Sequence, residues 1–149
     1  MTMPKKFLVL ADGSERILQT VNYLTEFMPV DDNTRIVLYH VYAGIPDEYR
    51  HMENDPNCQT AALEFSRRET EEKQIISSYL DQARKDLVAA GFPESSVEIK
   101  LHVRKQGVAR DIIEEARKGY TAVILRRRGM GPLKNVILGS VAVKLLQSL

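Results

Sequence analysis

The sequence predicts an α/β fold, with one domain over residues 1–149 in which an open parallel sheet lies between two layers of helices. Strand-like and helix-like segments alternate along nearly the whole chain, and such alternation implies right-handed βαβ crossovers. Several strand-like segments are nearly continuous apolar runs, which is typical of parallel strands that are covered on both faces. A chain of 149 residues can bury such a core without a disulfide or a cofactor.

The first half of the chain begins with the strand-like run KKFLVLA, which stops at the turn sequence DGS. Apolar residues then recur at helical spacing from Ser14 to Pro29, so a helix is expected directly after the first strand. The β-branched and aromatic segment 35–41, RIVLYHV, predicts a second buried strand. Residues 43–57 combine Gly, Pro, Asn and Asp without a sustained period, which indicates a long surface loop.

The second half repeats this alternation. Residues 64–90 predict a helix, before Gly91 and Pro93, that is polar at first and amphipathic afterwards. In SSVEIKLHV apolar and polar residues alternate, so this strand is expected near an edge of the sheet. A compact helix over 107–119 and a buried strand over 120–125 follow. After a loop at 128–138, a final helix is expected from about Ser140.

Charge and cysteine content restrict the function classes. Lys and Arg total 21 against 20 Asp and Glu, and the net charge is +1, which gives no general reason to expect a nucleic-acid or acidic-membrane partner. The single cysteine, Cys58, cannot form an internal disulfide, and no Cys/His set has zinc spacing. A cytoplasmic compartment is therefore expected. The apolar run at 7–11 is too short for a signal peptide or a membrane span.

The first candidate site residue is Asp12, at the end of the first strand. Ligands of open parallel sheets bind beyond the carboxyl ends of the strands, where the winding direction reverses. The Asp12 carboxylate could accept hydrogen bonds there from a ribose or an exocyclic amine. Asp12, Gly13 and Ser14 are also common helix-capping residue types, so position alone leaves both interpretations open.

The second candidate site extends from Gly129 to Ser140. A helix that starts after Gly139 would offer unpaired N–H groups and the positive end of its dipole to an anion, and Ser140 would add a hydroxyl donor. The alternative is a Gly-Ser cap after a loop. The spacing matches neither the dinucleotide fingerprint nor the P-loop.

Together these elements resemble the universal stress protein family. FLVLADGSE, IVLYHVY, GVARDIIEEA and RRRGMGPLKNVILGSVAVKLL follow the family's order over nearly the whole chain. The last segment is similar to the family's Gly-x2-Gly-x9-Gly-Ser/Thr motif. The resemblance implies a Rossmann-like domain of the adenine nucleotide alpha hydrolase-like type, usually a homodimer. It also implies binding of ATP or another adenine nucleotide, with Mg or Mn carried on the phosphates.

The resemblance also assigns roles to residues of this chain. In nucleotide-binding members, the residue at Asp12, with Ala11 beside it, holds adenine or ribose, and the backbone at Val41 reads the adenine edge. The phosphates would be surrounded by Gly129, Gly139, Ser140 and the amide of Val141.

The chain departs from the family pattern at two places. Arg126 stands where the motif's first glycine belongs, and it could either obstruct the pocket or pair with phosphate through its guanidinium. Obstruction would make the domain a nucleotide-free dimerisation or interaction module, which is the alternative function. The sequence also ends at LLQSL, where family members usually continue into a fifth strand that commonly forms the dimer seam.

The expected function is therefore that of a cytoplasmic, ATP-binding stress-response protein. Nucleotide binding would change the loop at 128–138 and so modulate contacts with an unidentified protein partner. His40 and His102 are interpreted as structural, and with no convincing general base, at most a weak ATPase is expected. An adenylating enzyme is not supported, because the chain has no Ser-Gly-Gly or His-x-Gly-His element after the first strand.

Overall fold

The structure is a computed structural model, which describes residues 4–42, 59–126 and 135–138. Its elements in chain order are β1 (Lys5–Leu10), α1 (Arg16–Phe27), β2 (Thr34–Tyr42), α3 (Gln59–Ala89), the short 3₁₀ turn η2 (Glu94–Ser96), β3 (Val97–Val103), α4 (Val108–Ala116), β4 (Ala122–Arg126) and β5 (Asn135–Leu138). These elements confirm the predicted α/β alternation.

The five strands form one sheet in the order β3-β2-β1-β4-β5. All pairs among the first four strands are parallel, as βαβ crossovers require. The chain moves outward from β1 to β3, then returns through α4 to place β4 on the other side of β1. The winding direction therefore reverses between β1 and β4. β3 lies at an edge, as its alternating sequence predicts.

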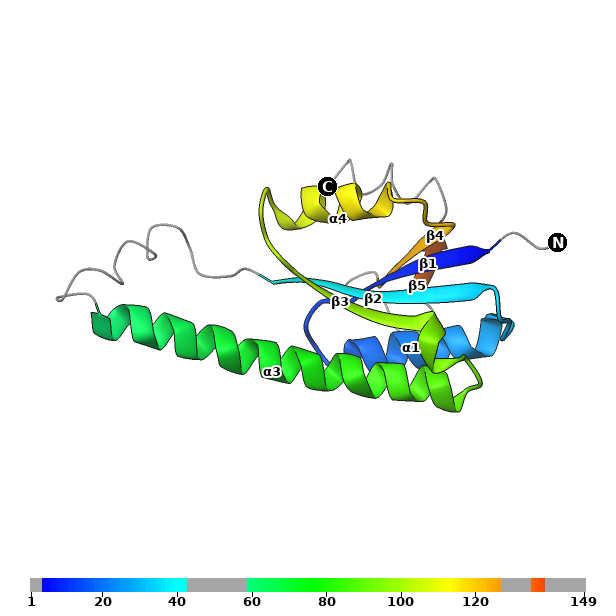
Figure 1. Ribbon diagram of the computed structural model, residues 1–149, viewed down its shortest axis with the longest axis horizontal. Helices are drawn as coiled ribbons and strands as arrows, with labels where there is room; N and C mark the ends of the chain where they lie inside the picture. The colour runs from blue at the N-terminus through cyan, green and yellow to red at the C-terminus, as the bar shows by residue number, and fades with distance from the viewer. Residues whose placement is uncertain (1–3, 43–58, 127–134, 139–149) are drawn as a thin grey trace.

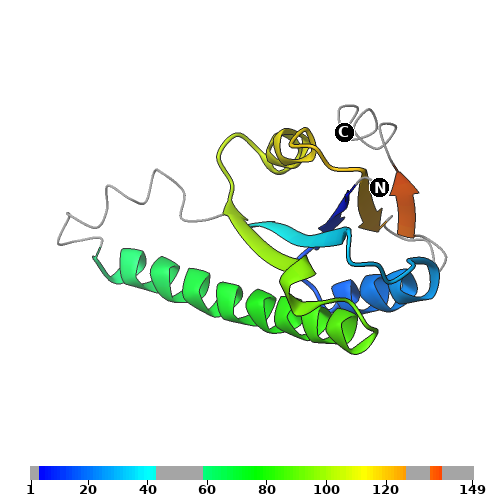
Figure 2. The same cartoon turned by 45° about the vertical axis from the view of Figure 1, so that its right-hand side comes forward.

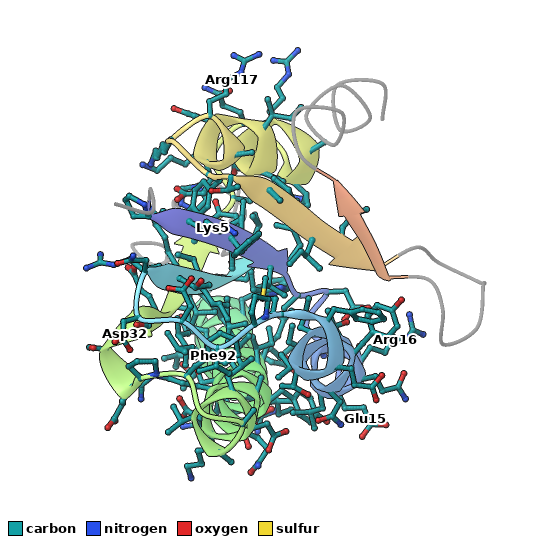
Figure 3. The ribbon with its side chains drawn as sticks, turned by 90° about the vertical axis from the view of Figure 1, so that its right-hand side faces the viewer. Lys5, Glu15, Arg16, Asp32, Phe92 and Arg117 are labelled. Carbon is teal, nitrogen blue, oxygen red and sulfur yellow. The ribbon has the colours of Figure 1, made fainter. Side chains whose placement is uncertain are left out.

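Helices cover both faces of this sheet. α1 and α3 lie on one face and α4 lies on the other (Figures 1 and 2). Strand residues alternate between the two faces, so Val9 and Leu38 belong to the core beneath α1 and α3, whereas Leu8 and Val37 belong to a smaller core with α4. Phe92 fills the first core, on the α1 and α3 side of the sheet (Figure 3). The predicted layers are confirmed.

The predicted loop at 128–138 is wrong in its last part. Residues 135–138 form β5, which pairs antiparallel with β4 from Asn135 opposite Arg126 to Leu138 opposite Val123. The apolar segment Val136 to Leu138 suits a strand, but it is short and lies between glycines, which favoured a loop. The loop at 43–57 and the helix expected from Ser140 lie outside the described residues.

The helix α3 is longer than its apolar stripe requires. Its first half extends past the carboxyl ends of the strands (Figure 1), and this half carries ion pairs at i,i+4 spacing. Such pairs, together with residues of good helix propensity, support an exposed helix. The polar segment of the prediction is therefore helical, and it stands beside the edge of the sheet where ligands of such folds bind.

Candidate functional site

The candidate site lies at the carboxyl ends of β1, β2 and β4. Ala11 and Asp12 follow β1 directly, Val41 is near the end of β2, and Arg126 ends β4. Extending the β1–β4 register, which pairs Val9 with Ile124, brings Arg126 level with Ala11. The structure thus brings together the backbone of these four predicted residues. The predicted phosphate residues Gly129, Gly139, Ser140 and Val141 lie outside the part of the chain that the structure describes.

The turn from β1 into α1 is held by Asp12. Its Oδ1 accepts hydrogen bonds from the Ser14 N–H (3.0 Å) and the Ser14 hydroxyl (2.5 Å). The Ser14 Oγ in turn accepts from the Arg16 N–H at 3.2 Å, which satisfies an amide at the start of α1. Asp12 and Ser14 therefore hold the turn ahead of α1, whose N-cap residue is Glu15.

The other carboxylate oxygen of Asp12 is available to a ligand. Among the described residues, Oδ2 contacts only the Arg16 guanidinium, at 3.5 Å, and the Asp12 side chain is 45% exposed. Partial burial raises the pKa of Asp12, but the Ser14 hydrogen bonds and the charge of Arg16 outweigh it, so the pKa lies below its ordinary value. Asp12 therefore presents an ionised, open acceptor as well as a cap.

The main chain of Val41 is also available. In a parallel ladder, alternate residues direct both main-chain groups to the same neighbouring strand. The Tyr39 carbonyl accepts from the Ala11 N–H at 2.9 Å, so the Val41 N–H and C=O also face the β1 side. The β1–β2 pairing ends at Leu10 opposite Tyr39. Val41 makes no main-chain hydrogen bond with the described residues that follow β1. Main-chain polar groups inside proteins are almost always paired, and among the described residues these two groups have no main-chain partner.

His40 connects the turn to β2. Its Nδ1 lies 2.8 Å from the Ala11 carbonyl oxygen, and its side chain is buried on the α1 and α3 side of the sheet. This contact agrees with the structural interpretation of His40. His102, also interpreted as structural, lies 3.5 Å from the buried Asp111 carboxylate on the other face.

A cavity of about 320 Å³ lies between this turn and α3. Its lining residues come from the turn, from β2 and from the exposed half of α3, and they are Asp12, Gly13, His40, Arg68, Glu71, Glu72, Ile75 and Ile76. The α3 residues were missed at the sequence level, because only the folded helix places them opposite Asp12. Arg16 was missed as well, although its i,i+4 spacing from Asp12 was a usable signal.

These groups offer both a hydrogen-bond donor and acceptors. The Val41 N–H and C=O are a neighbouring donor and acceptor on one strand. The open oxygen of Asp12 can accept a ribose hydroxyl. In the described ranges there is no cluster of three His, Cys, Asp or Glu side chains that could bind a metal ion. No helix in those ranges is long and apolar enough to cross a membrane.

The open, mostly parallel sheet with helices on both faces and a reversal of winding between β1 and β4 defines a doubly wound α/β domain. The model of the universal stress protein family matches residues 3–149. The chain belongs to this family, as its motifs predicted. A search of curated proteins found no match.

Solved structures share the fold. A universal stress protein from Archaeoglobus fulgidus has a TM-score of 0.56 and 20% identity, with 97% of this chain and 92% of that chain covered. The hypothetical protein MJ0577 has a TM-score of 0.59 and 24% identity, with 98% and 90% covered. A universal stress protein in complex with cAMP matches at a TM-score of 0.46 and 16% identity, with 78% and 73% covered.

Proposed function

We propose that this chain binds an adenine nucleotide, ATP foremost, at the carboxyl edge of its sheet. The observation that carries the proposal is that the Val41 N–H and C=O have no main-chain partner among the described residues, at the same edge of the sheet as the partly exposed Asp12 carboxylate. A donor and an acceptor in fixed order match the adenine edge, and they disfavour guanine, in which the order is reversed. Asp12 would hold the ribose, next to Ala11.

The phosphates would lie toward the end of β4. Gly129, Gly139, Ser140 and the Val141 amide are the proposed phosphate ligands, on the basis of the family motif that the sequence carries. Arg126, level with Ala11 by register, would pair with a phosphate oxygen through its guanidinium. A divalent ion, Mg or Mn, would arrive on the phosphates.

Binding would act as a signal more than as a step in catalysis. The segment from 128 to 140 follows β4 and contains three of the proposed phosphate ligands, Gly129, Gly139 and Ser140. Nucleotide binding would therefore change the surface that this segment offers to a protein partner. We infer a cytoplasmic homodimer of this single domain, with at most weak ATP hydrolysis.

The test is calorimetry of the full chain with ATP and with GTP. The wild-type chain is expected to bind ATP and to bind GTP at least about tenfold more weakly, since one reversed hydrogen-bond pair is worth about 1.4 kcal/mol or more. Asp12→Ala should lower ATP affinity about 30-fold, the cost of a hydrogen bond to a charged group. Asp31→Ala is the matched control, because Asp31 also accepts an amide two residues on, from Asn33, but precedes β2 at the opposite edge.

The same measurement decides the alternative. If the wild-type chain ignores ATP and Arg126→Gly binds it, Arg126 fills the pocket and the domain is a nucleotide-free interaction module. If neither binds, the nucleotide proposal is wrong. If both bind and the glycine variant is weaker, Arg126 contributes to phosphate binding, as proposed.

A further inference from the structure

The hydrogen-bond ladder between β1 and β2 stops where a side chain replaces its next rung. The last rung runs from the Ala11 N–H to the Tyr39 carbonyl, at 2.9 Å. The next rung of a parallel ladder would run from the Val41 N–H to the Ala11 carbonyl. That carbonyl instead meets Nδ1 of His40 at 2.8 Å, and the Val41 rung is not formed within the described part of the chain.

The chemistry of this contact fixes the state of the ring. A carbonyl oxygen can only accept a hydrogen bond, so Nδ1 of His40 is the nitrogen that carries the proton. The other ring edge lies under the turn. A Cβ added to Gly13 would be 3.1 Å from Cε1 and 3.4 Å from Nε2 of His40, and 3.6 Å from Ile76 Cδ1.

The surroundings hold the ring in this position. His40 is 7% exposed and Ile76 is 3% exposed, so the ring is enclosed between the sheet and α3. Gly13 has φ of +86°, a conformation that glycine adopts without strain, and its missing side chain lets the turn lie close against the imidazole. A buried ring with one fixed hydrogen bond is a rigid positioning group.

We propose that His40 is a positioning residue for base recognition: by occupying the Ala11 carbonyl it ends the β1–β2 ladder and keeps the Val41 main chain free for the nucleotide base. This inference rests on the proposed function, because it supplies the reason why Val41 can read the adenine edge. Without the imidazole donor, we expect the Ala11 carbonyl to take the Val41 N–H as its replacement donor, and the base then loses that donor.

Two polar substitutions separate this role from simple packing. His40→Asn places an amide donor near the position of Nδ1 and should keep the Ala11 contact. His40→Gln places its donor near the position of Nε2 and should release the Ala11 carbonyl to Val41. His40→Leu serves as a second variant that lacks any donor, in case the glutamine variant does not fold.

The test combines binding with amide exchange. For wild type and His40→Asn, we expect the same ratio of ATP affinity to GTP affinity. In His40→Gln or His40→Leu this ratio should fall about tenfold, which corresponds to the loss of one hydrogen bond. Affinity for inorganic tripolyphosphate, which has no base, should stay the same in all variants. In the ligand-free state, the Val41 amide should exchange more slowly in the glutamine or leucine variant than in wild type.

The outcomes distinguish the two proposals. If wild type binds ATP and the donor-less variants keep both its base preference and its Val41 exchange rate, the role of His40 is wrong and the proposed function stands. If wild type binds no ATP, the proposed function is wrong and the base-positioning role is overturned with it. Loss of tripolyphosphate affinity together with ATP affinity would show a structural effect and would also overturn the positioning role.

Discussion

The two faces of the sheet use carboxylates in opposite ways. On the α4 face, Glu115 is 5% exposed and both of its oxygens are occupied: Oε1 accepts from Lys100 Nζ at 2.8 Å and Lys118 Nζ at 3.0 Å, and Oε2 accepts from the Tyr120 hydroxyl at 2.6 Å. At the carboxyl edge, Asp12 is 45% exposed, and within the described part of the chain one of its oxygens has no contact closer than a 3.5 Å ion pair.

Asp111 follows the pattern of Glu115. It is buried, and its two oxygens accept the N–H groups of Lys105 (2.7 Å) and Gln106 (3.1 Å) ahead of α4. These contacts fix the connection from β3 into α4. Burial raises the pKa of Asp111, but the amide hydrogen bonds and nearby His102 outweigh it and leave that pKa below its ordinary value.

The difference separates stability from binding. A carboxylate whose oxygens all accept hydrogen bonds inside the protein has no acceptor left for a ligand. When such a carboxylate is removed, its former donors are left without an acceptor, which destabilises the fold. A carboxylate that caps a turn with one oxygen and leaves the other open can serve a ligand. The carboxylates of the α4 face therefore stabilise the domain, and in the proposed function the β1–α1 turn contributes to binding.

The largest effect on stability is expected at Glu115. Glu115→Ala leaves Lys100 and Tyr120 without their acceptor, and we expect the free energy of unfolding to fall by about 3 kcal/mol. Glu114→Ala, an exposed neighbour on the same helix, should change it by less than about 0.5 kcal/mol. Urea unfolding measures both. If both variants lower the free energy of unfolding by the same small amount, the buried carboxylate does not stabilise the α4 face as we infer.

A smaller effect concerns acid. Burial raises the pKa of Glu115, but the hydrogen bonds from Lys100, Tyr120 and Lys118 outweigh it and lower that pKa from 4.5 to about 2. Because the folded-state value is depressed, this contribution is complete above pH 4.5 and is lost as the pH falls through about 2. The difference in unfolding free energy between wild type and Glu115→Gln should therefore shrink in acid. A difference that does not change with pH would contradict the assignment.

Much of the fold was predictable because local patterns decide it. The apolar runs at β1, β2 and β4 and the alternation in β3 gave the buried strands and the edge. β5 was missed because four residues between glycines carry little periodic signal. The first half of α3 is stabilised by exposed ion pairs and has little apolar surface, so a prediction from the apolar stripe gives a helix that is too short.

The candidate site was predictable only in part. Motif position identified Asp12 and Val41, and the structure brings them to one edge. The contact of His40 with the Ala11 carbonyl could not be inferred from sequence, because it depends on how the β1–α1 turn lies against β2. The cavity wall from α3 depends on how that helix returns across the sheet after residues 43–57.

Hydrogen exchange of the Val41 amide in wild-type protein, with and without saturating ATP, tests the central claim most directly. The account predicts a Val41 amide that exchanges readily in the free protein and becomes protected when ATP binds, because the base then accepts its hydrogen bond. An amide that is already protected without ligand, or one that stays unprotected while calorimetry shows ATP bound, would contradict it.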